Sequence, residues 1–577
     1  MKKLYSFIFA MLFLLSAAFV FAAKTKEVPK VEKTMPFSKG LSFGDWLEEK
    51  QNGNSFTTLY NRQDFDDIKS LGVEILRIPI WFEEFSSGEP DYIVEDWLWE
   101  KIDKAVEWCT ELEIYVIIDF HNDCGGGTKT RPDIEKVLLK IWPQIAERYK
   151  DSGKYVLYEI YNEPHMQSGN IADDVAKWGK IQGNVLKKIR EIDKTHTVIV
   201  GAEDWNSVTQ LLKLPDYKDN NIILNFHDYS PFLFTTQGAD YCGLGAVRHI
   251  PFPYSKDKMP KKPKNQKNQG WIDEMFANYR TESSEASLVK PLDEAVKFAN
   301  KCGVALMCNE YGVRMEYTDH DDRTNWYRLK AKWMDERNII RVSWSYRESF
   351  GIFNNPSLLA SEAKFPEDLN TDILDAMGYN TSLEPQIHLT WFENAKKSGD
   401  YTIYKNGFVK GLVTKDWQWT NVRKFRIYNK DSSDEEAYIH VPNANSNQRI
   451  ECLFGEACDL SELVNSGKTL EFEIRSNQKN LGINIYFMDK EIPGTGKANL
   501  PWRCQTTIND KLVPADGKWH KVSIPLKDFY ETGAFSESEQ KWYNGAGFFS
   551  WAKVNELTFD FAKALQNDVS IRNIAIR

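Results

Sequence analysis

The chain has 577 residues, of which 42% are hydrophobic and 27% are charged, and its formal net charge is −10 at pH 7. This hydrophobic content supports large packed cores and excludes an intrinsically disordered chain. The acidic balance excludes nucleic acid as the main partner, because phosphate binding requires a basic surface.

The chain starts with the features of a secretory signal. Two lysines follow the first residue, an apolar run spans 4–21, and Ala22 and Ala23 come next. A basic start, an apolar stretch and small residues at the cleavage point are the three parts of a cleavable signal peptide. We therefore predict a signal at residues 1–22, a secreted or cell-surface protein, and no membrane span after cleavage. The apolar run is also close to the shortest membrane span, so an uncleaved anchor is the alternative.

Between residues 36 and 380, short apolar runs alternate with amphipathic stretches. The runs are rich in β-branched residues and almost continuously apolar, which is typical of parallel strands buried on both faces. Eight runs are present, at 40–44, 73–80, 113–121, 155–163, 195–203, 221–229, 304–312 and 339–346. Stretches such as 96–112 and 292–303 have helical periodicity, and Gly303 is a predicted helix C-cap. Strand and helix repeated eight times predict a (β/α)8 TIM barrel, an α/β fold, which we assign to residues 23–385.

One connection in this predicted barrel is unusually long. The segment 230–287 follows the sixth apolar run and contains a lysine-rich stretch at 255–269. It is far longer than an ordinary loop between a strand and a helix. We predict a solvated surface insertion, and the alternative is a lid or wall of the substrate cleft.

The last third of the chain has a different pattern of apolar residues. Short segments with alternating apolar residues are separated by turn residues, at 469–476, 481–488, 518–526, 554–561 and 569–576. This pattern predicts an all-β jelly-roll sandwich over residues 386–577.

The cysteines and histidines do not form a metal-binding pattern. Eight cysteines in 577 residues are too few for a disulfide scaffold, although Cys452 and Cys458 are close enough in sequence to pair in an oxidising compartment. Cys124 lies near His121, but the second cysteine pair of a zinc site is missing. We predict no metal and no cofactor.

In a TIM barrel, the active site lies at the carboxyl ends of the strands. Here the predicted strand ends carry polar, titratable or aromatic side chains, where apolar residues would pack more easily. They are Arg77, His121, Asn162, Glu163, His227, Tyr229, Glu310 and Trp344. One buried polar strand end is usually structural. Eight at one rim are hard to explain by packing, because each buried polar group needs a partner or a function.

Two of these residues, Glu163 and Glu310, are carboxylates on the fourth and seventh strands, which face each other across the barrel mouth. A retaining glycosidase requires two carboxyl groups about 5–5.5 Å apart, one to attack the anomeric carbon and one to protonate the leaving oxygen. The aromatic Tyr161 beside Glu163 favours a protonated acid. Arg77 and Tyr229 can keep a nucleophilic carboxylate ionised.

The stretch VLYEIYNEPH at 156–165 resembles the signature of glycoside hydrolase family 5, the large cellulase family. Further matches fall at the ends of other predicted strands: LRIPI (76–80), IDFHN (118–122), FHDY (226–229), CNEYG (308–312) and VSWSY (342–346). The resemblance covers residues 36–380. It implies an acid/base at strand four and a nucleophile at strand seven.

Carried over to this chain, the resemblance implies that Glu163 is the acid/base and Glu310 the nucleophile. It implies that Asn162 hydrogen-bonds the 2-hydroxyl group of the sugar at the cleavage site. Arg77 and Tyr229 would orient Glu310 and keep it ionised.

The resemblance also implies roles for three rings at the rim. His227 would lie near the acid/base, His121 near the sugar on the non-reducing side, and Trp344 under that sugar as a platform. The chain departs from the pattern at Asp45, where many relatives have Asn. This departure leaves the contacts of the more distant subsite open.

Other rim residues are weaker candidates. Trp46, Trp81 and Trp205 follow strands one, two and five and are possible subsite platforms, with packing at the rim as the alternative. Asp204 and His165 could bond sugar hydroxyl groups, but supporting roles are the simpler interpretation.

The C-terminal sandwich resembles the galactose-binding-like, carbohydrate-binding jelly rolls found beside such catalytic domains. The match depends on GKWHKVSIPLKDF (517–529) and on the closing strands at 555–577. Candidate ligand aromatics, each equally compatible with a core position, are Trp417, Trp419, Trp502, Trp542 and Trp551.

Together these features predict a secreted retaining endo-β-1,4-glucanase, a monomer that acts on a β-linked polysaccharide. A mannanase, a xyloglucanase and a mixed-linkage glucanase are alternatives with the same constellation of residues. An alternative from another class is a non-catalytic surface protein that binds carbohydrate.

Overall fold

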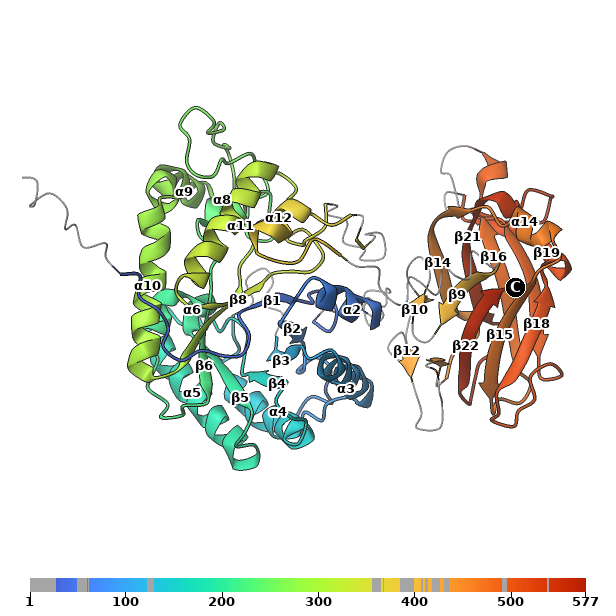
Figure 1. Cartoon of the computed structure of the whole chain (residues 1–577), viewed down its shortest axis with the longest axis horizontal. Coiled ribbons are helices and arrows are strands. Elements are labelled where there is room, and N and C mark those ends of the chain that lie inside the picture. The colour runs from blue at the N-terminus through green and yellow to red at the C-terminus, as the bar shows by residue number, and fades with distance from the viewer. Residues whose placement is uncertain are drawn as a thin grey trace, which may run out of the picture.

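Eight parallel strands close into a barrel in the first part of the computed structural model (Figure 1). They are β1 (Lys39–Ser42), β2 (Ile75–Ile80), β3 (Tyr115–Phe120), β4 (Val156–Glu159), β5 (Thr197–Gly201), β6 (Ile222–His227), β7 (Ala305–Glu310) and β8 (Ile340–Ser343). Each strand pairs with the next along the chain, and β8 pairs with β1. Seven of them lie within the predicted runs, and β1 begins one residue before its run at 40–44, so the predicted barrel is confirmed.

The structure describes residues 27–48, 60, 62–121, 129–354, 365–366, 368–383, 399–405, 408–409, 414–417, 426–429, 436, 438–441, 443–489, 496–536 and 539–577. The predicted signal at 1–22, Cys124 and the predicted domain boundary at 385–386 lie outside these residues. The signal and the boundary therefore stay predictions. Among the residues described, no helix is both long and apolar enough to cross a membrane.

Helices follow the strands and surround the barrel (Figure 1). They are α2 (Arg62–Ser70), α3 (Asp96–Glu111), α4 (Ile134–Tyr149), α5 (Ile171–Ile192), α6 (Glu203–Asn206), α7 (Val208–Leu211), α8 (Phe232–Thr235), α9 (Gln269–Glu282), α10 (Glu285–Cys302), α11 (His320–Asp335) and α12 (Thr371–Ala376). Helix α10 begins where the Ser284 side chain accepts a hydrogen bond from the backbone N–H of Ser287. It ends at Gly303, the predicted C-cap, whose φ of 69° favours glycine.

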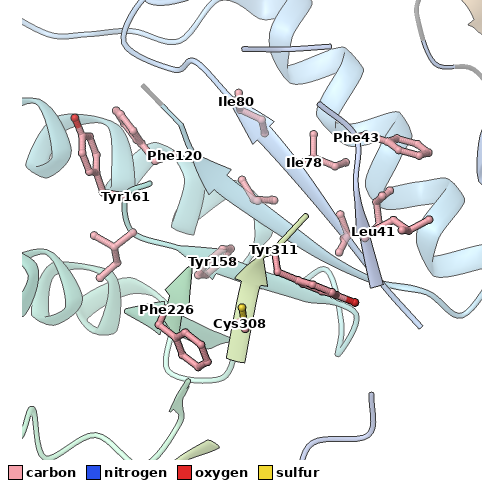
Figure 2. Close-up of a cluster of buried hydrophobic side chains, with 14 of the residues drawn as sticks. Leu41, Phe43, Ile78, Ile80, Phe120, Tyr158, Tyr161, Phe226, Cys308 and Tyr311 are labelled. Carbon is pink, nitrogen blue, oxygen red and sulfur yellow. The ribbon is translucent and has the colours of Figure 1, made fainter. Parts of the chain in front are cut away.

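The two faces of each strand have different surroundings. Outward-facing side chains pack under the helices, where Figure 2 shows Leu41, Ile78, Phe120, Tyr158 and Phe226 in one buried cluster. Because side chains alternate along a strand, the residues between them face the inside of the barrel.

The inside of the barrel is apolar at its floor and polar toward its mouth. The floor residues are Ile75, Ile117, Leu157, Ile223 and Met307. Two residues further along the same strands come Arg77, Asp119, Glu159, Asn225 and Asn309, all buried. This step of two residues places a layer of polar side chains beneath the mouth.

The long insertion after β6 packs onto the barrel. Its core contains Phe234 of α8, Phe252, and Tyr279 of α9. The Tyr279 hydroxyl donates a hydrogen bond to the carbonyl of Pro251 at 2.5 Å. The lysine-rich part at 255–269 is largely exposed, as predicted for a solvated surface. A role as a lid stays a prediction.

The last third of the chain forms two antiparallel sheets, which confirms the predicted all-β domain. One sheet contains β9 (Tyr401–Lys405), β10 (Phe408–Val409), β12 (Arg426–Asn429), β13 (Tyr438–Val441), β15 (Thr469–Ser476), β18 (His520–Pro525) and β22 (Val569–Ile576). The other contains β11 (Thr414–Trp417), β14 (Gln448–Cys458), β16 (Gly482–Asp489), β17 (Arg503–Asn509), β19 (Tyr530–Ser536), β20 (Lys541–Asn544) and β21 (Val554–Phe561). A short helix, α14 (Ser461–Asn465), joins β14 to β15.

Cys452 and Cys458 do not form the suggested disulfide, because both are free thiols. They lie six positions apart on the single strand β14, which is extended backbone. The pairing of β14 with β21 is irregular between Leu453 and Cys458, and the Cys458 Sγ accepts a hydrogen bond from the Tyr401 hydroxyl at 3.1 Å.

Candidate active site

Glu163 and Glu310 meet at the mouth of the barrel. Glu310 ends β7, and Glu163 lies four residues after β4 in the left-handed region, with φ of 44°. A carboxylate oxygen of each and a ring nitrogen of His227 all lie within 4.8 Å of one another. A non-glycine residue in that backbone region is strained, and such strain is concentrated at functional sites.

Glu310 is a buried carboxyl group surrounded by donors. Arg77 Nη1 donates to Oε1 at 2.7 Å, and the Tyr229 hydroxyl donates to Oε2 at 3.0 Å. His227 Nδ1 lies 3.5 Å from Oε2. Burial by itself would raise the pKa of Glu310, but the charges of His227 and Arg77 outweigh it and hold the pKa below its ordinary value.

Arg77 is completely buried and binds three further acceptors. It donates to both oxygens of Glu159 at 2.8 and 3.1 Å and to Asn162 Oδ1 at 2.8 Å, and its Nη2 lies 2.9 Å from Asp119 Oδ2. Sequence reasoning missed Glu159 and Asp119. The two-residue period of a strand could have predicted that both face the inside of the barrel, since each lies two residues after an inward-facing floor residue.

His227 links the two carboxylates. Its Nδ1 lies 2.7 Å from Glu163 Oε1, and the amide nitrogen of Asn206 lies 3.2 Å from its Nε2. Burial disfavours the charged ring, but the carboxylates of Glu310 and Glu163 outweigh burial and raise the pKa of His227. The ring is therefore suited to donate a proton toward Glu163.

His121, Asn162 and Trp344 form the other side of the mouth. His121 Nδ1 lies 2.7 Å from Asp119 Oδ2, and its Nε2 lies 3.2 Å from Asn162 Nδ2. Its ring stacks against half-buried Trp344, with centroids 5.9 Å apart and planes at 16°. Burial would lower the pKa of His121, but Asp119 and Glu48 outweigh it and raise the pKa to about 9.

The three candidate platforms have different surroundings. Trp46 is only 2% exposed and packs edge-on against Phe43 and Phe65, so its prediction as a sugar platform is wrong. The Trp46 ring belongs instead to the aromatic core at the start of the barrel. Trp81 is half-buried, whereas Trp205 is 40% exposed and stacks on His165 at 4.6 Å. Trp205 therefore has the most accessible ring.

The candidate aromatics of the sandwich also divide into core and surface. Trp502 is 1% exposed and belongs to the core, and Trp551 is half-buried against Phe487 and Phe529. Trp542 is 41% exposed, with the Arg503 guanidinium 5.2 Å from its ring. Trp417 ends β11, and Trp419 lies outside the described residues.

Within the described part of the chain, Glu163, His227 and Glu310 are the one group of acidic and imidazole side chains close enough to hold a metal ion. The chemistry of this set favours protons instead. Both Glu310 oxygens already accept hydrogen bonds, and the Arg77 guanidinium at 2.7 Å would repel a cation.

Comparison with known proteins identifies two domains. The model of the family described as cellulase, glycosyl hydrolase family 5, matches residues 35–349. The model of carbohydrate binding domain 30 matches residues 442–577.

Several similar proteins are endoglucanases. Endoglucanase 3 of Fibrobacter succinogenes is 26% identical over 57% of this chain, which spans about half, 53%, of that protein. Endoglucanase C of Acetivibrio thermocellus is 27% identical over 55% of this chain and 94% of that protein. Among solved structures, endoglucanase Cel5A from Thermotoga maritima is 25% identical, with a TM-score of 0.44 over 59% of this chain and 96% of that chain.

The family 5 model covers more than half of the 577 residues, including both carboxylates at the barrel mouth. The chain therefore belongs to glycoside hydrolase family 5, and it is an O-glycosyl hydrolase that carries a carbohydrate-binding domain.

Proposed function

We propose that the chain is a secreted, retaining endo-β-1,4-glucanase with its catalytic domain at residues 23–385. The observation that carries this proposal is the pair Glu163 and Glu310, which each bring one carboxylate oxygen to within 4.8 Å of the other. An inverting enzyme holds its carboxyl groups about 6.5–9.5 Å apart to leave room for water, whereas direct attack needs about 5–5.5 Å.

In the first step, a Glu310 oxygen attacks the anomeric carbon while the carboxylic acid of Glu163 gives its proton to the glycosidic oxygen. The bond between carbon and that oxygen breaks, and an ester joins the sugar to Glu310. In the second step, the Glu163 carboxylate takes a proton from water, whose oxygen attacks the same carbon and frees Glu310. After the second step, Glu310 is again a carboxylate and Glu163 is again a carboxylic acid.

The surrounding side chains suit this division of roles. Arg77 and Tyr229 hold the Glu310 carboxylate ionised and aimed at the mouth. Asn162, fixed by Arg77, is placed to bind the 2-hydroxyl group of the sugar under attack. The endoglucanase names of the relatives support a β-glucan substrate, and the apolar start of the chain supports secretion.

The nucleophile is tested with Glu310→Gln. We expect reducing-sugar release from carboxymethyl-cellulose to fall below about one-thousandth of the wild-type rate, while the variant still binds the polysaccharide in a pull-down. Glu107→Gln, an exposed residue on α3, is the matched control and should remain fully active. If wild-type and variant chains both bind without releasing sugar, the protein is a binding protein and the proposal is wrong.

Retention and substrate class have separate readouts. Proton NMR of the first product from a soluble oligosaccharide should show the β-anomer before mutarotation. A panel of carboxymethyl-cellulose, lichenan, glucomannan, xyloglucan, xylan and laminarin then ranks the substrates. Faster hydrolysis of glucomannan or xyloglucan than of carboxymethyl-cellulose would replace the β-1,4-glucanase assignment with one of the alternatives.

A further inference from the structure

The insertion that follows β6 contains a surface cavity of about 460 Å³ that lies outside the catalytic site. Its lining comes from the segment before α9, from the last turn of α9 and from the junction between α9 and α10. The lining residues are Pro253, Tyr254, Lys256, Arg280, Ser283 and Ser284. None of them is a strand-end residue of the barrel rim. Small-molecule sites typically enclose about 300–1,000 Å³, so the cavity is large enough for a ligand.

Two positive side chains border this cavity without a negative partner. Lys256 and Arg280 are both exposed, and neither forms an ion pair or a side-chain hydrogen bond within the part of the chain that the structure describes. The lining residues include no carboxylate. The whole chain has a net charge of −10, so on average it repels dissolved anions. The two cations give this cavity the opposite preference.

The N-terminus of α10 adds backbone donors to the cavity. Ser284, one of the lining residues, is the N-cap of this 18-residue helix, and its side chain accepts a hydrogen bond from the Ser287 N–H. The N–H groups of Glu285 and Ala286 have no acceptor among the described residues. The first N–H groups of a helix have no partner inside it, and the helix dipole is positive at this end. Both effects favour an anion next to Ser284.

Ser283 supplies a buried hydroxyl group that has no hydrogen-bond partner. It lines the cavity, yet it is only 3% exposed, so it lies at the floor. Its Oγ has no partner among the residues described. A buried polar atom without a partner is costly, so a ligand that accepts from this hydroxyl would relieve the cost. A serine hydroxyl can donate in several directions, because rotation about the Cα–Cβ bond moves it between staggered positions.

We propose that this cavity is a binding site for a compact oxyanion, which is either the carboxylate of an acidic sugar or a phosphate group. The side chains of Lys256 and Arg280 supply positive charge, and the start of α10 and the Ser283 hydroxyl supply neutral donors. All of these groups donate hydrogen bonds, and an oxyanion only accepts them. Tyr254 adds an aromatic wall on which the ring of an acidic sugar can pack.

The position of the cavity suits a polysaccharide enzyme. Helix α10 precedes β7 and runs beside the barrel in the opposite direction to the strands, so its N-terminus lies at the end of the barrel that carries the mouth (Figure 1). A polysaccharide at the mouth could therefore present an acidic side group to the cavity. This use of the site rests on the proposed glucanase function, whereas binding of the oxyanion does not.

The test measures binding of sodium glucuronate and of inorganic phosphate to the full-length protein by isothermal titration calorimetry at low ionic strength. We expect a Kd on the order of 1 mM for at least one of them. Arg280→Gln and Lys256→Gln should each weaken binding about 3–10-fold, because each removes one charge-assisted contact that is partly screened by solvent. Added sodium chloride should weaken binding as well, since salt screens exposed charges.

Two further variants separate a binding site from a general effect of charge or folding. Lys264→Gln removes the same charge from an exposed lysine of the same insertion that does not line the cavity, so the Kd should stay within about twofold. Ser283→Ala removes the hydroxyl group that has no partner. It should weaken binding without lowering the midpoint of unfolding in urea, because no hydrogen bond of the folded protein is lost.

Each outcome decides the inference. Tighter binding of glucuronate assigns the site to an acidic sugar, and tighter binding of phosphate assigns it to a phosphate group. The inference fails if neither probe binds at about 20 mM, or if Lys264→Gln weakens binding as much as Arg280→Gln does. Hydrolysis of uncharged soluble substrates should be unchanged in all four variants, so failure of the inference leaves the glucanase function standing.

Discussion

At the scale of single residues, Glu310 shows how a buried carboxyl group can stay ionised. Desolvation alone would favour its neutral form, since a charge is poorly solvated inside a protein. The guanidinium of Arg77, the ring of His227 and the hydroxyl of Tyr229 all favour the charged form. Their combined effect exceeds that of burial, so the pKa is lowered and the nucleophile is available at neutral pH.

Removing one of these donors should move the pH dependence of catalysis. In Tyr229→Phe, the Glu310 carboxylate loses the hydrogen bond to Oε2, so its pKa rises. The nucleophile must be ionised, so we expect the acid limb of the kcat/KM profile to move to higher pH and the plateau to fall about 10–100-fold. Tyr217→Phe, which removes a hydroxyl bonded to Gln182 far from the mouth, is the control. An unmoved acid limb would show that Tyr229 does not stabilise the charge.

At the scale of elements, the end of β6 is held by a buried ion pair with helix α11. His227 and Tyr229 face the mouth, so Asp228 between them faces outward toward the helix. Lys330 Nζ, which is fully buried on α11, lies 2.5 Å from Asp228 Oδ2. The other Asp228 oxygen accepts the backbone N–H of Ser230 at 3.0 Å. This pair fixes the turn that presents two active-site side chains.

Breaking the pair should destabilise the barrel. Lys330→Met leaves the Asp228 carboxylate buried without its cation, and we expect a loss of about 3–5 kcal/mol in the free energy of unfolding. The double variant Lys330→Met with Asp228→Asn removes both charges and should lose less. The midpoint of activity loss in urea measures the effect on the barrel. The exposed Lys332→Met on the same helix should change stability by no more than about 0.5 kcal/mol. Additive losses in the double variant would contradict the ion-pair explanation.

At the scale of the whole molecule, the chain has separate cores for its two halves. The clusters of the barrel draw on residues between 31 and 383, and the clusters of the sandwich draw on residues between 401 and 576. No hydrophobic cluster of the described residues combines the two. Because a domain needs its own core to fold alone, each half meets that condition.

Ending the chain at residue 385 should therefore leave a folded catalytic domain. We expect unchanged kcat/KM on soluble 4-nitrophenyl β-cellobioside and weaker binding to insoluble cellulose, because the carbohydrate-binding domain is removed. Sedimentation with cellulose and soluble assays on the same preparation measure the two effects. An aggregated or inactive product would mean that the sandwich supports the barrel instead of the substrate.

The sequence alone determined the barrel and most of its rim. Strand period and apolar content depend on neighbours in the chain, so the eight runs and the polar residues that end them could be predicted from local pattern. The family signature around Glu163 then assigned roles to those residues. Even Gly303 could be assigned, since helix termination is also local.

Only the tertiary structure decided which side chains meet. The approach of Glu163 to Glu310 joins two strands far apart in the chain, and the burial of Trp46 depends on an aromatic core built from other segments. Asp119 and Glu159 became part of the site because strand register and closure of the barrel turn them inward. Contacts of this kind depend on packing between distant segments, which a local sequence pattern does not encode.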